Sequence, residues 1–142
     1  PLRSWRMTLF TDLPLKPELL STLASAGYTT PTPIQAAAVP ELLAGHDLLA
    51  QAPTGSGKTV AFGLPLLQRL DAGRIATQAL VLCPTRELAD QVTKEIRRLA
   101  RFMENIKVLS LVGGTPIGPQ RASLEHGAHI VVGTPGRLLD HL

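Results

Sequence analysis

The sequence predicts an α/β fold in which helices flank a mostly parallel sheet. Short apolar runs alternate with longer amphipathic stretches, which is the pattern of strand–helix–strand units. The short runs are apolar throughout, as in strands that are buried on both faces. With 142 residues, 44% of them hydrophobic and 18% charged, the chain has the composition of one globular domain.

Four apolar runs are the expected strands. They cover residues 47–51, 79–83, 106–112 and 129–133. No apolar run approaches the roughly 20 residues that span a bilayer, so the sequence predicts no membrane association.

The first two helices are expected from the residues at their ends. One should begin near Pro17, because the fixed φ of proline suits the first helical turn, and end before Gly27. The next should be capped by Thr32, begin at Pro33 and end at Gly45.

Two longer helices should follow. One should run from the end of the glycine-rich segment to about residue 71, with Pro65 removing one of its hydrogen bonds. The other should cover residues 86–102, with an apolar face at helical spacing made of Leu88, Val92, Ile96 and Leu99. Residues 113–119 and 133–136, rich in glycine and proline, are expected to form loops.

The content of charged residues, cysteine and histidine bears on the partners, the compartment and the metal sites that we expect. The 14 basic and 11 acidic residues give a net charge of +3, which permits a polyanionic partner but does not require one. The single cysteine, Cys83, cannot form an internal disulfide and no secretory leader is evident, so we expect a cytoplasmic protein. The four histidines are scattered, and no metal site built by protein side chains alone is expected.

The strongest functional signal is a glycine-rich segment between an expected strand and an expected helix. Gly55 and Gly57 allow positive φ and a close backbone approach, and amides at a helix start attract phosphate. Lys58 should reach the β- and γ-phosphates of ATP, and Thr59 should offer its hydroxyl to the Mg²⁺ bound with it. The alternative is a glycine-rich turn with a chance lysine. The full segment is Ala52, Pro53, Thr54, Gly55, Ser56, Gly57, Lys58 and Thr59, and Ala52 replaces the first glycine of the strict phosphate-loop motif.

An upstream segment resembles a motif of the DEAD-box RNA helicases. Residues 27–35, Gly-Tyr-Thr-Thr-Pro-Thr-Pro-Ile-Gln, are similar to the Q motif of that family, and Phe10 lies at the spacing of its isolated aromatic residue. The resemblance implies that Phe10, Thr30 and Gln35 bind adenine. An amide can donate and accept together against N7 and N6 of adenine, while a ring can stack on the base. The alternative places Gln35 on an exposed helix face and Phe10 in the core.

Three further segments resemble RNA-facing motifs of the same family. They are residues 84–89 (Pro-Thr-Arg-Glu-Leu-Ala), the pair at 113–114 (Gly-Gly) and residues 134–137 (Thr-Pro-Gly-Arg). Each follows the carboxyl end of an expected strand, where open α/β sheets bind ligands. Taken singly, each could be an ordinary turn. The resemblance implies contacts to RNA phosphate and sugar, with little sequence preference, from Thr85, Arg86, Gly113, Gly114, Thr134, Gly136 and Arg137.

The resemblance covers the chain from about residue 10 to its last residue. Around residues 83–92 and 136–142 the sequence looks most like the bacterial DbpA branch of the family. It implies that residues 7–142 are the N-terminal part of the first RecA-like domain, a C-terminally truncated P-loop fold. Residues 1–6 are expected to be an extension or an expression remnant. The implied function is that of an ATP-dependent RNA helicase, which couples ATP binding and hydrolysis to duplex unwinding.

Groups that the family uses for hydrolysis are absent from this sequence. The Asp-Glu-Ala-Asp carboxylates, the Ser-Ala-Thr motif and a second domain with arginine fingers do not occur in it. Because an arginine finger alone contributes about 10³- to 10⁵-fold in rate, we expect this chain by itself not to hydrolyse ATP. Two alternatives are a non-catalytic module that binds adenine nucleotide or RNA, and another P-loop ATPase such as a DNA translocase. The Q motif argues against the translocase.

Overall fold

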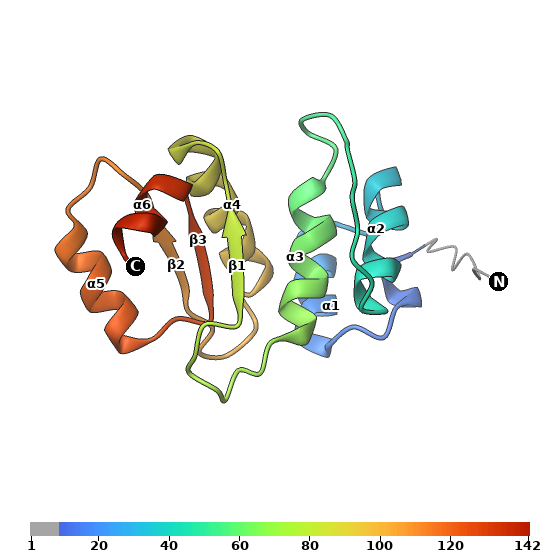
Figure 1. The fold of residues 1–142 in the computed structure, drawn as a ribbon. Helices are drawn as coiled ribbons and strands as arrows, with labels where there is room; N and C mark the ends of the chain where they lie inside the picture. Colours follow the sequence, from blue (N-terminus) through green and yellow to red (C-terminus); the bar gives the residue numbers. More distant parts are fainter. Residues whose placement is uncertain (1–8) are drawn as a thin grey trace. The chain divides into compact units, whose positions relative to one another are not determined.

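The structure, a computed structural model, describes residues 9–142. Within them the chain divides into two compact units. The first contains the residues up to 69 together with 98–103, and the second contains residues 70–97 and 104–142. The expected extension at residues 1–6 lies outside the described residues. Helices build the first unit, and a sheet with helices builds the second (Figure 1).

The first unit contains a short 3-10 helix and three α-helices. They are η1 (Phe10–Asp12), α1 (Pro17–Ser25), α2 (Pro33–Leu43) and α3 (Lys58–Arg69). Helix α2 packs on α3, and η1 packs on α1. Gln68 of α3 accepts a hydrogen bond of 2.7 Å from the backbone N–H of Lys16, which ties the start of α1 to α3. The fully buried side chains of this unit include Leu19, Val39, Leu64 and Leu67.

The predicted ends of α1 and α2 are confirmed. Pro17 and Pro33 are the first residues of their helices, where a missing N–H costs no helical hydrogen bond. Gly27 and Gly45 follow the helices with φ of 78° and 88°, in the left-handed region that glycine tolerates best. Proline at the start and glycine after the end therefore set the length of both helices.

The second unit has a three-stranded parallel sheet in the order β1-β3-β2. The strands are β1 (Ala79–Leu82), β2 (Val108–Leu111) and β3 (Ile130–Gly133). Central β3 is buried along its whole length, and its Val131 lies opposite Leu80 of β1 and Leu109 of β2. Three of the four predicted strands are thus confirmed, and so is the parallel α/β class.

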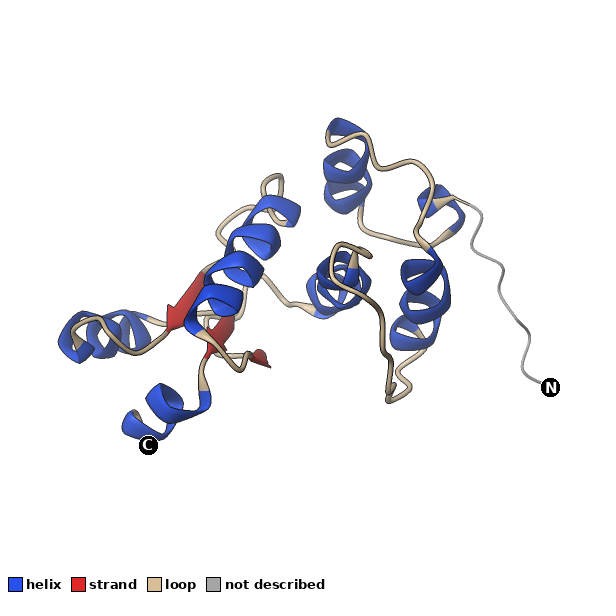
Figure 2. Cartoon of the chain, turned by 90° about the horizontal axis from the view of Figure 1, so that it is seen from above, coloured by secondary structure: helices blue, strands red, loops and turns tan. Residues whose placement is uncertain are grey.

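Helices cover the sheet of the second unit. They are α4 (Arg86–Leu99), α5 (Ile117–His126) and α6 (Pro135–Asp140), and α4 and α6 lie on opposite faces of the sheet (Figure 2). Ala89, Val92 and Ile96 of α4 are buried, whereas Leu88, predicted on that apolar face, is exposed. A helical spacing of three or four residues allowed either Leu88 or Ala89 on that face, and the structure buries the alanine. A cluster of Leu111, Ala128 and Val131 packs against Leu109, Leu124 and Leu138.

The predicted strand at residues 47–51 is wrong. These residues form no strand, and the side chain of Leu49 is fully exposed. Apolar residues indicate where a strand could be buried, but a strand forms only when a neighbour accepts and donates its ladder hydrogen bonds. Within residues 9–142 no strand pairs with this segment, which is why its apolar pattern does not become a strand.

Helix α5 begins inside a stretch that was predicted to be a loop. Gly118 and Pro119 lie in its first turn, where proline removes no helical hydrogen bond. The turn residues were therefore correctly identified at 113–116 and wrongly extended by three residues. Predicted helix ends near residues 71 and 102 also move inward, to Arg69 and Leu99.

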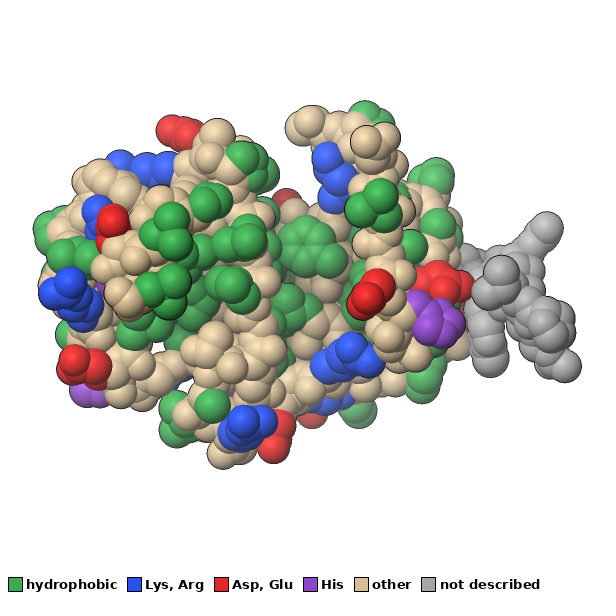
Figure 3. Space-filling view, in the orientation of Figure 1, with side chains coloured by type: hydrophobic (Ala, Val, Ile, Leu, Met, Phe, Trp, Pro, Cys, Tyr) green, Lys and Arg blue, Asp and Glu red, His purple; other side chains and the backbone are tan. Residues whose placement is uncertain are grey.

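One face of the second unit remains apolar. Leu80 and Leu82 of β1 and Leu139 of α6 are exposed. Figure 3 shows hydrophobic side chains gathered over the strands on the viewed face of this unit. No helix among the described residues is long and apolar enough to cross a membrane.

Candidate nucleotide and nucleic-acid sites

The glycine-rich segment forms a turn that leads directly into α3. Gly55 and Gly57 have φ of 81° and 85°, a conformation that strains any residue with a Cβ. The backbone N–H of Ser56 donates to the carbonyl of Pro53 at 3.2 Å, which closes the turn. The two glycines are therefore needed for the backbone path, as the sequence predicts.

The side chains of this loop suit a phosphate ligand. Lys58 is the first residue of α3 and its side chain is exposed, while Thr59 is half-buried. The hydroxyl of Ser56 is buried without a hydrogen-bond partner. Backbone amides at a helix start, an exposed ammonium and an unsatisfied hydroxyl all match the acceptor oxygens of a phosphate group.

Gln35 joins α2 to the glycine-rich loop. Its side-chain Nε2 donates to the carbonyl of Gly57 at 3.2 Å, and its Oε1 accepts from the backbone N–H of Thr32 at 2.9 Å. A Cβ on Gly57 would collide with this amide nitrogen. The structure thus brings together the predicted phosphate-binding and adenine-binding segments through one hydrogen bond.

The amide of Gln35 keeps spare hydrogen-bonding capacity. An amide has two N–H donors and two acceptor lone pairs, and these two bonds use one of each. One donor and one acceptor remain, which is what N7 and N6 of adenine require. The side chain is only 1% exposed, so a base reaches it only when neighbouring groups move.

The other two residues predicted at the adenine site, Phe10 and Thr30, differ in burial. Phe10 is 2% exposed and lines a cavity of about 220 Å³ with Leu20, Leu23 and Tyr28. It therefore anchors η1 in the core of the first unit, the alternative role that the sequence allowed. Thr30 is exposed.

The predicted RNA-facing segments converge at one edge of the second unit. All three strands are parallel, and Leu82, Gly133 and Leu111 are paired at their carboxyl ends. The loops that follow them therefore leave the sheet side by side. The backbone N–H of Cys83 donates to Gly133 at 2.9 Å, and that of Thr134 donates to Leu111 at 3.1 Å.

Arg86 and Gly114 are neighbours at this edge. Gly114 has φ of 78°, and the guanidinium Nη1 of Arg86 lies 2.7 Å from the position that a Cβ would take there. The hydroxyl of Thr85 accepts from the backbone N–H of Leu88 at 3.2 Å and so caps the start of α4. Absence of a side chain at Gly114 is thus what lets Arg86 lie against that loop.

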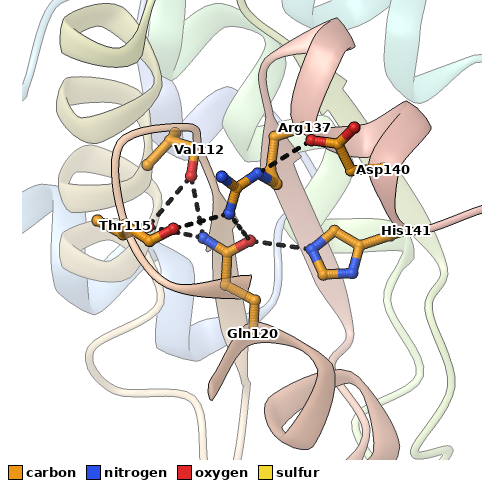
Figure 4. Close-up of polar contacts among 6 residues, drawn as sticks. All are labelled: Val112, Thr115, Gln120, Arg137, Asp140 and His141. Carbon is orange, nitrogen blue, oxygen red and sulfur yellow. Dashed lines mark hydrogen bonds and ion pairs between the residues drawn. The ribbon is translucent and has the colours of Figure 1, made fainter. Parts of the chain in front are cut away.

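A buried polar cluster at the same edge was not found from the sequence (Figure 4). Gln120 of α5 donates through Nε2 to the carbonyl of Val112 at 3.0 Å and to the hydroxyl of Thr115 at 2.9 Å. Its Oε1 accepts from Nη1 of Arg137 at 3.3 Å and from Nε2 of His141 at 2.9 Å. The sequence offered no signal for Gln120, because α5 was not predicted and two of its four partners, Arg137 and His141, lie 17 and 21 residues away.

The guanidinium of Arg137 interacts mainly with groups of the protein itself. Its Nη1 also donates to the carbonyl of Thr115 at 2.9 Å, and the side chain is 14% exposed. Its Nε lies 3.4 Å from the carboxylate of Asp140, an ion pair without hydrogen-bond geometry, so that nitrogen remains unsatisfied as a donor. The guanidinium therefore holds the loop after β2 against α6.

Cys83, at the end of β1, is a buried free thiol. Burial raises the pKa of this thiol above its usual range, because the charged thiolate loses its hydration. The thiol form is therefore favoured at neutral pH, and the residue is unsuited to nucleophilic chemistry.

Comparisons with known proteins agree with these features. The sequence profile of the DEAD/DEAH box helicases matches residues 32–142. ATP-dependent RNA helicase DbpA of Escherichia coli K12 is 64% identical over 137 residues, which cover 96% of this chain and 30% of that protein. ATP-dependent RNA helicase DeaD of the same organism is 53% identical over 135 residues, which cover 95% of this chain and 22% of that protein.

A solved structure is also similar. The crystal structure of a DEAD box protein from the hyperthermophile Methanococcus jannaschii matches with a TM-score of 0.88 and 42% identity. The match covers 94% of this chain and 36% of that one. The chain thus spans only about a third or less of the length of these relatives.

Proposed function

Because this chain belongs to the DEAD/DEAH box helicase family, we propose that it supplies the ATP-binding part of an ATP-dependent RNA helicase. One observation carries the proposal: the left-handed glycines at the start of α3 are hydrogen-bonded, through the carbonyl of Gly57, to the buried amide of Gln35. A phosphate cradle and an amide able to bind a purine are therefore one connected structure.

The loop at residues 52–59 would hold the phosphates of ATP. Its backbone amides and the ammonium of Lys58 donate to phosphate oxygens, and the unsatisfied hydroxyl of Ser56 gains an acceptor there. Thr59 would ligate the Mg²⁺ that accompanies the nucleotide, a metal that neutralises phosphate charge when bound. The remaining members, Ala52, Pro53 and Thr54, would complete the nucleotide-binding segment.

Adenine would be held by Gln35, Thr30 and Phe10. The spare donor and acceptor of Gln35 fit N7 and N6 of adenine, whereas guanine presents acceptors at both N7 and O6, so the spare acceptor of Gln35 would face another acceptor. Phe10 is buried in the core, so its stacking on the base would require η1 to move when nucleotide binds. The role of Gln35 predicts a preference for ADP over GDP.

RNA would bind at the carboxyl edge of the sheet in the second unit. Thr85, Gly113, Gly114, Thr134 and Gly136 would contact phosphate and sugar, as would the exposed guanidinium of Arg86. Arg137, with its partners inside the protein, would contribute through a small remaining exposed surface. Backbone contacts of this kind predict binding that weakens strongly with salt.

Unwinding activity belongs to the whole protein and is tested there. The rate of ATP hydrolysis by the full-length protein that carries this sequence should rise several-fold when single-stranded RNA is added. An ATPase that no RNA stimulates would rule out the helicase proposal.

We place this protein in the cytoplasm, supported by its lone, unpaired cysteine among the described residues.

A second function fits the chain taken by itself. None of the family's Asp-Glu-Ala-Asp carboxylates occurs in these 142 residues, so the isolated chain would bind adenine nucleotide or RNA without turnover. Nucleotide binding by calorimetry together with no phosphate release would support this role. Release of phosphate by the isolated chain at a rate near that of the full-length protein would refute it.

A further inference from the structure

The amide of Gln120 connects two loops at the carboxyl edge of the sheet. On one side its Nε2 donates to Val112 and Thr115, which enclose the glycine pair at 113–114. On the other side its Oε1 accepts from Arg137 and His141 at α6. Figure 4 shows this amide between the two sets of partners.

Only an amide can make this set of bonds. The carbonyl of Val112 can only accept, and the guanidinium of Arg137 can only donate. The side chain between them must therefore present a donor to one and an acceptor to the other. A carboxylate at position 120 lacks the donors, a hydroxyl or a neutral imidazole has only one donor, and a hydrocarbon lacks both, so two donated and two accepted bonds require an amide.

Burial makes these bonds costly to lose. Gln120 is 8% exposed, and both donors and both acceptor positions of its amide are used. A buried polar group that loses its partner keeps the full cost of its desolvation. Removal of the amide would leave the carbonyl of Val112 with one donor instead of two, and Arg137 without one of its acceptors.

We propose that Gln120 is a positioning residue that fixes the loop at 112–116 relative to the start of α6, so that both present their backbone groups to one RNA strand. The inference rests on the proposed RNA binding at this edge. Two loops that are already fixed bind a strand without the entropy cost of ordering them. If the amide is lost, the loops move independently, and that cost appears as weaker RNA binding.

The chain offers a matched control in Gln78. Its amide also makes three hydrogen bonds within the second unit, one from Asp71 at 2.9 Å and two to Asp71 and Arg74 at 2.8 and 2.9 Å. Gln78 precedes β1, so it lies at the amino edge of the parallel sheet, opposite the proposed RNA edge. Gln78→Met and Gln120→Met both remove a bonded amide and keep the side-chain volume.

The experiment measures RNA binding by the full-length protein that carries this sequence. Binding of a fluorescein-labelled single-stranded oligouridylate is followed by anisotropy, and urea denaturation measures stability. We expect both variants to be destabilised. Gln120→Met should raise the RNA Kd about tenfold, whereas Gln78→Met should leave it within about twofold. ADP affinity should not change in either variant.

Kinetics separate positioning from simple loss of folded protein. In RNA-stimulated ATP hydrolysis, Gln120→Met should raise the KM for RNA and keep kcat at saturating RNA. A fall in kcat with an unchanged KM would contradict the inference.

If Gln120→Met does not fold, Gln120→Glu replaces it, because the carboxylate keeps the bonds from Arg137 and His141 and loses only those to the loop. Wild-type RNA affinity in a folded Gln120→Glu protein would also contradict the inference.

The two proposals fail in different ways. If the wild-type protein binds no RNA, the RNA-binding function fails, and the positioning role fails with it. If the wild-type protein binds RNA and the two methionine variants weaken binding equally, only the role of Gln120 is overturned.

Discussion

Two buried glutamines, one in each unit, hold functional loops in opposite ways. Gln35 uses one donor and one acceptor of its amide, on Gly57 and Thr32, and keeps one of each. Gln120 uses all four positions on protein partners. Both are nearly inaccessible. The two amides are therefore alike in burial and differ in whether hydrogen-bonding positions remain unused by the protein.

The largest effect should come from the charge of Lys58, which follows Gly57 in the first unit. Lys58→Ala removes the ammonium proposed to donate to phosphate, and a hydrogen bond to a charged group contributes about 1.5–3 kcal/mol. We expect ADP affinity to fall about 10- to 100-fold in calorimetric titrations. Lys94→Ala, which removes an exposed lysine from α4, is the control and should bind ADP like the wild-type protein. Equal losses in both variants would show that net charge, and not the loop, governs binding.

The same substitution in the two glutamines tests the comparison directly. Gln35→Glu keeps an acceptor for Thr32 and loses the donor to Gly57 and to the base, so ADP affinity should fall about tenfold. Gln120→Glu should leave ADP affinity unchanged, because its partners all belong to the second unit, at the loop after β2 and at α6. A loss of ADP affinity in Gln120→Glu, or none in Gln35→Glu, would contradict the division of roles.

Two glycines of the phosphate loop separate backbone strain from the contact with Gln35. Gly55→Ala and Gly57→Ala place a Cβ at nearly equal positive φ, which costs about 1–2 kcal/mol in each. Only at Gly57 would the Cβ also displace the amide of Gln35. We expect the free energy of unfolding, from urea titration, to be about 1 kcal/mol lower for Gly57→Ala than for Gly55→Ala. Equal values would mean that Gln35 is not held against this glycine.

The smallest effect is expected where Arg86 lies against Gly114. Gly114→Ala and Gly27→Ala have the same φ of 78°, but only at Gly114 does a Cβ meet another group. The end of the exposed Arg86 side chain can move away at little cost, so stability should fall similarly in both. RNA affinity in the full-length protein should drop about threefold in Gly114→Ala only, because Arg86 leaves the proposed RNA edge. An equal drop in Gly27→Ala would place the cause in general destabilisation.

Signals from residues close together in the sequence were sufficient to predict many helix ends and three strands. Pro17, Pro33, Gly27 and Gly45 mark helix ends because their backbone preferences act within a few residues. The runs that became β1, β2 and β3 were identified in the same way, from apolar composition. The glycines at 55 and 57 also have the positive φ that the motif requires.

Features that depend on distant partners were missed or mistaken. Residues 47–51 have a strand-like composition but no strand to pair with among the described residues. Gln120 bonds to several segments because the fold brings it to Arg137 and His141, which lie 17 and 21 positions away in the sequence. No periodicity of the sequence encodes such contacts. The packing of Phe10 in the core depends on tertiary contacts that sequence spacing does not describe, and its contact with adenine stays a prediction.

The most direct test of the account is a calorimetric titration of the protein with ADP and with GDP. The spare donor and acceptor of Gln35 match the edge of adenine and oppose that of guanine, and one such mismatch costs at least about 1–3 kcal/mol. We predict that ADP binds about tenfold more tightly than GDP. Equal affinity for the two nucleotides would contradict the account, because it would leave the phosphate loop without a base-selecting partner.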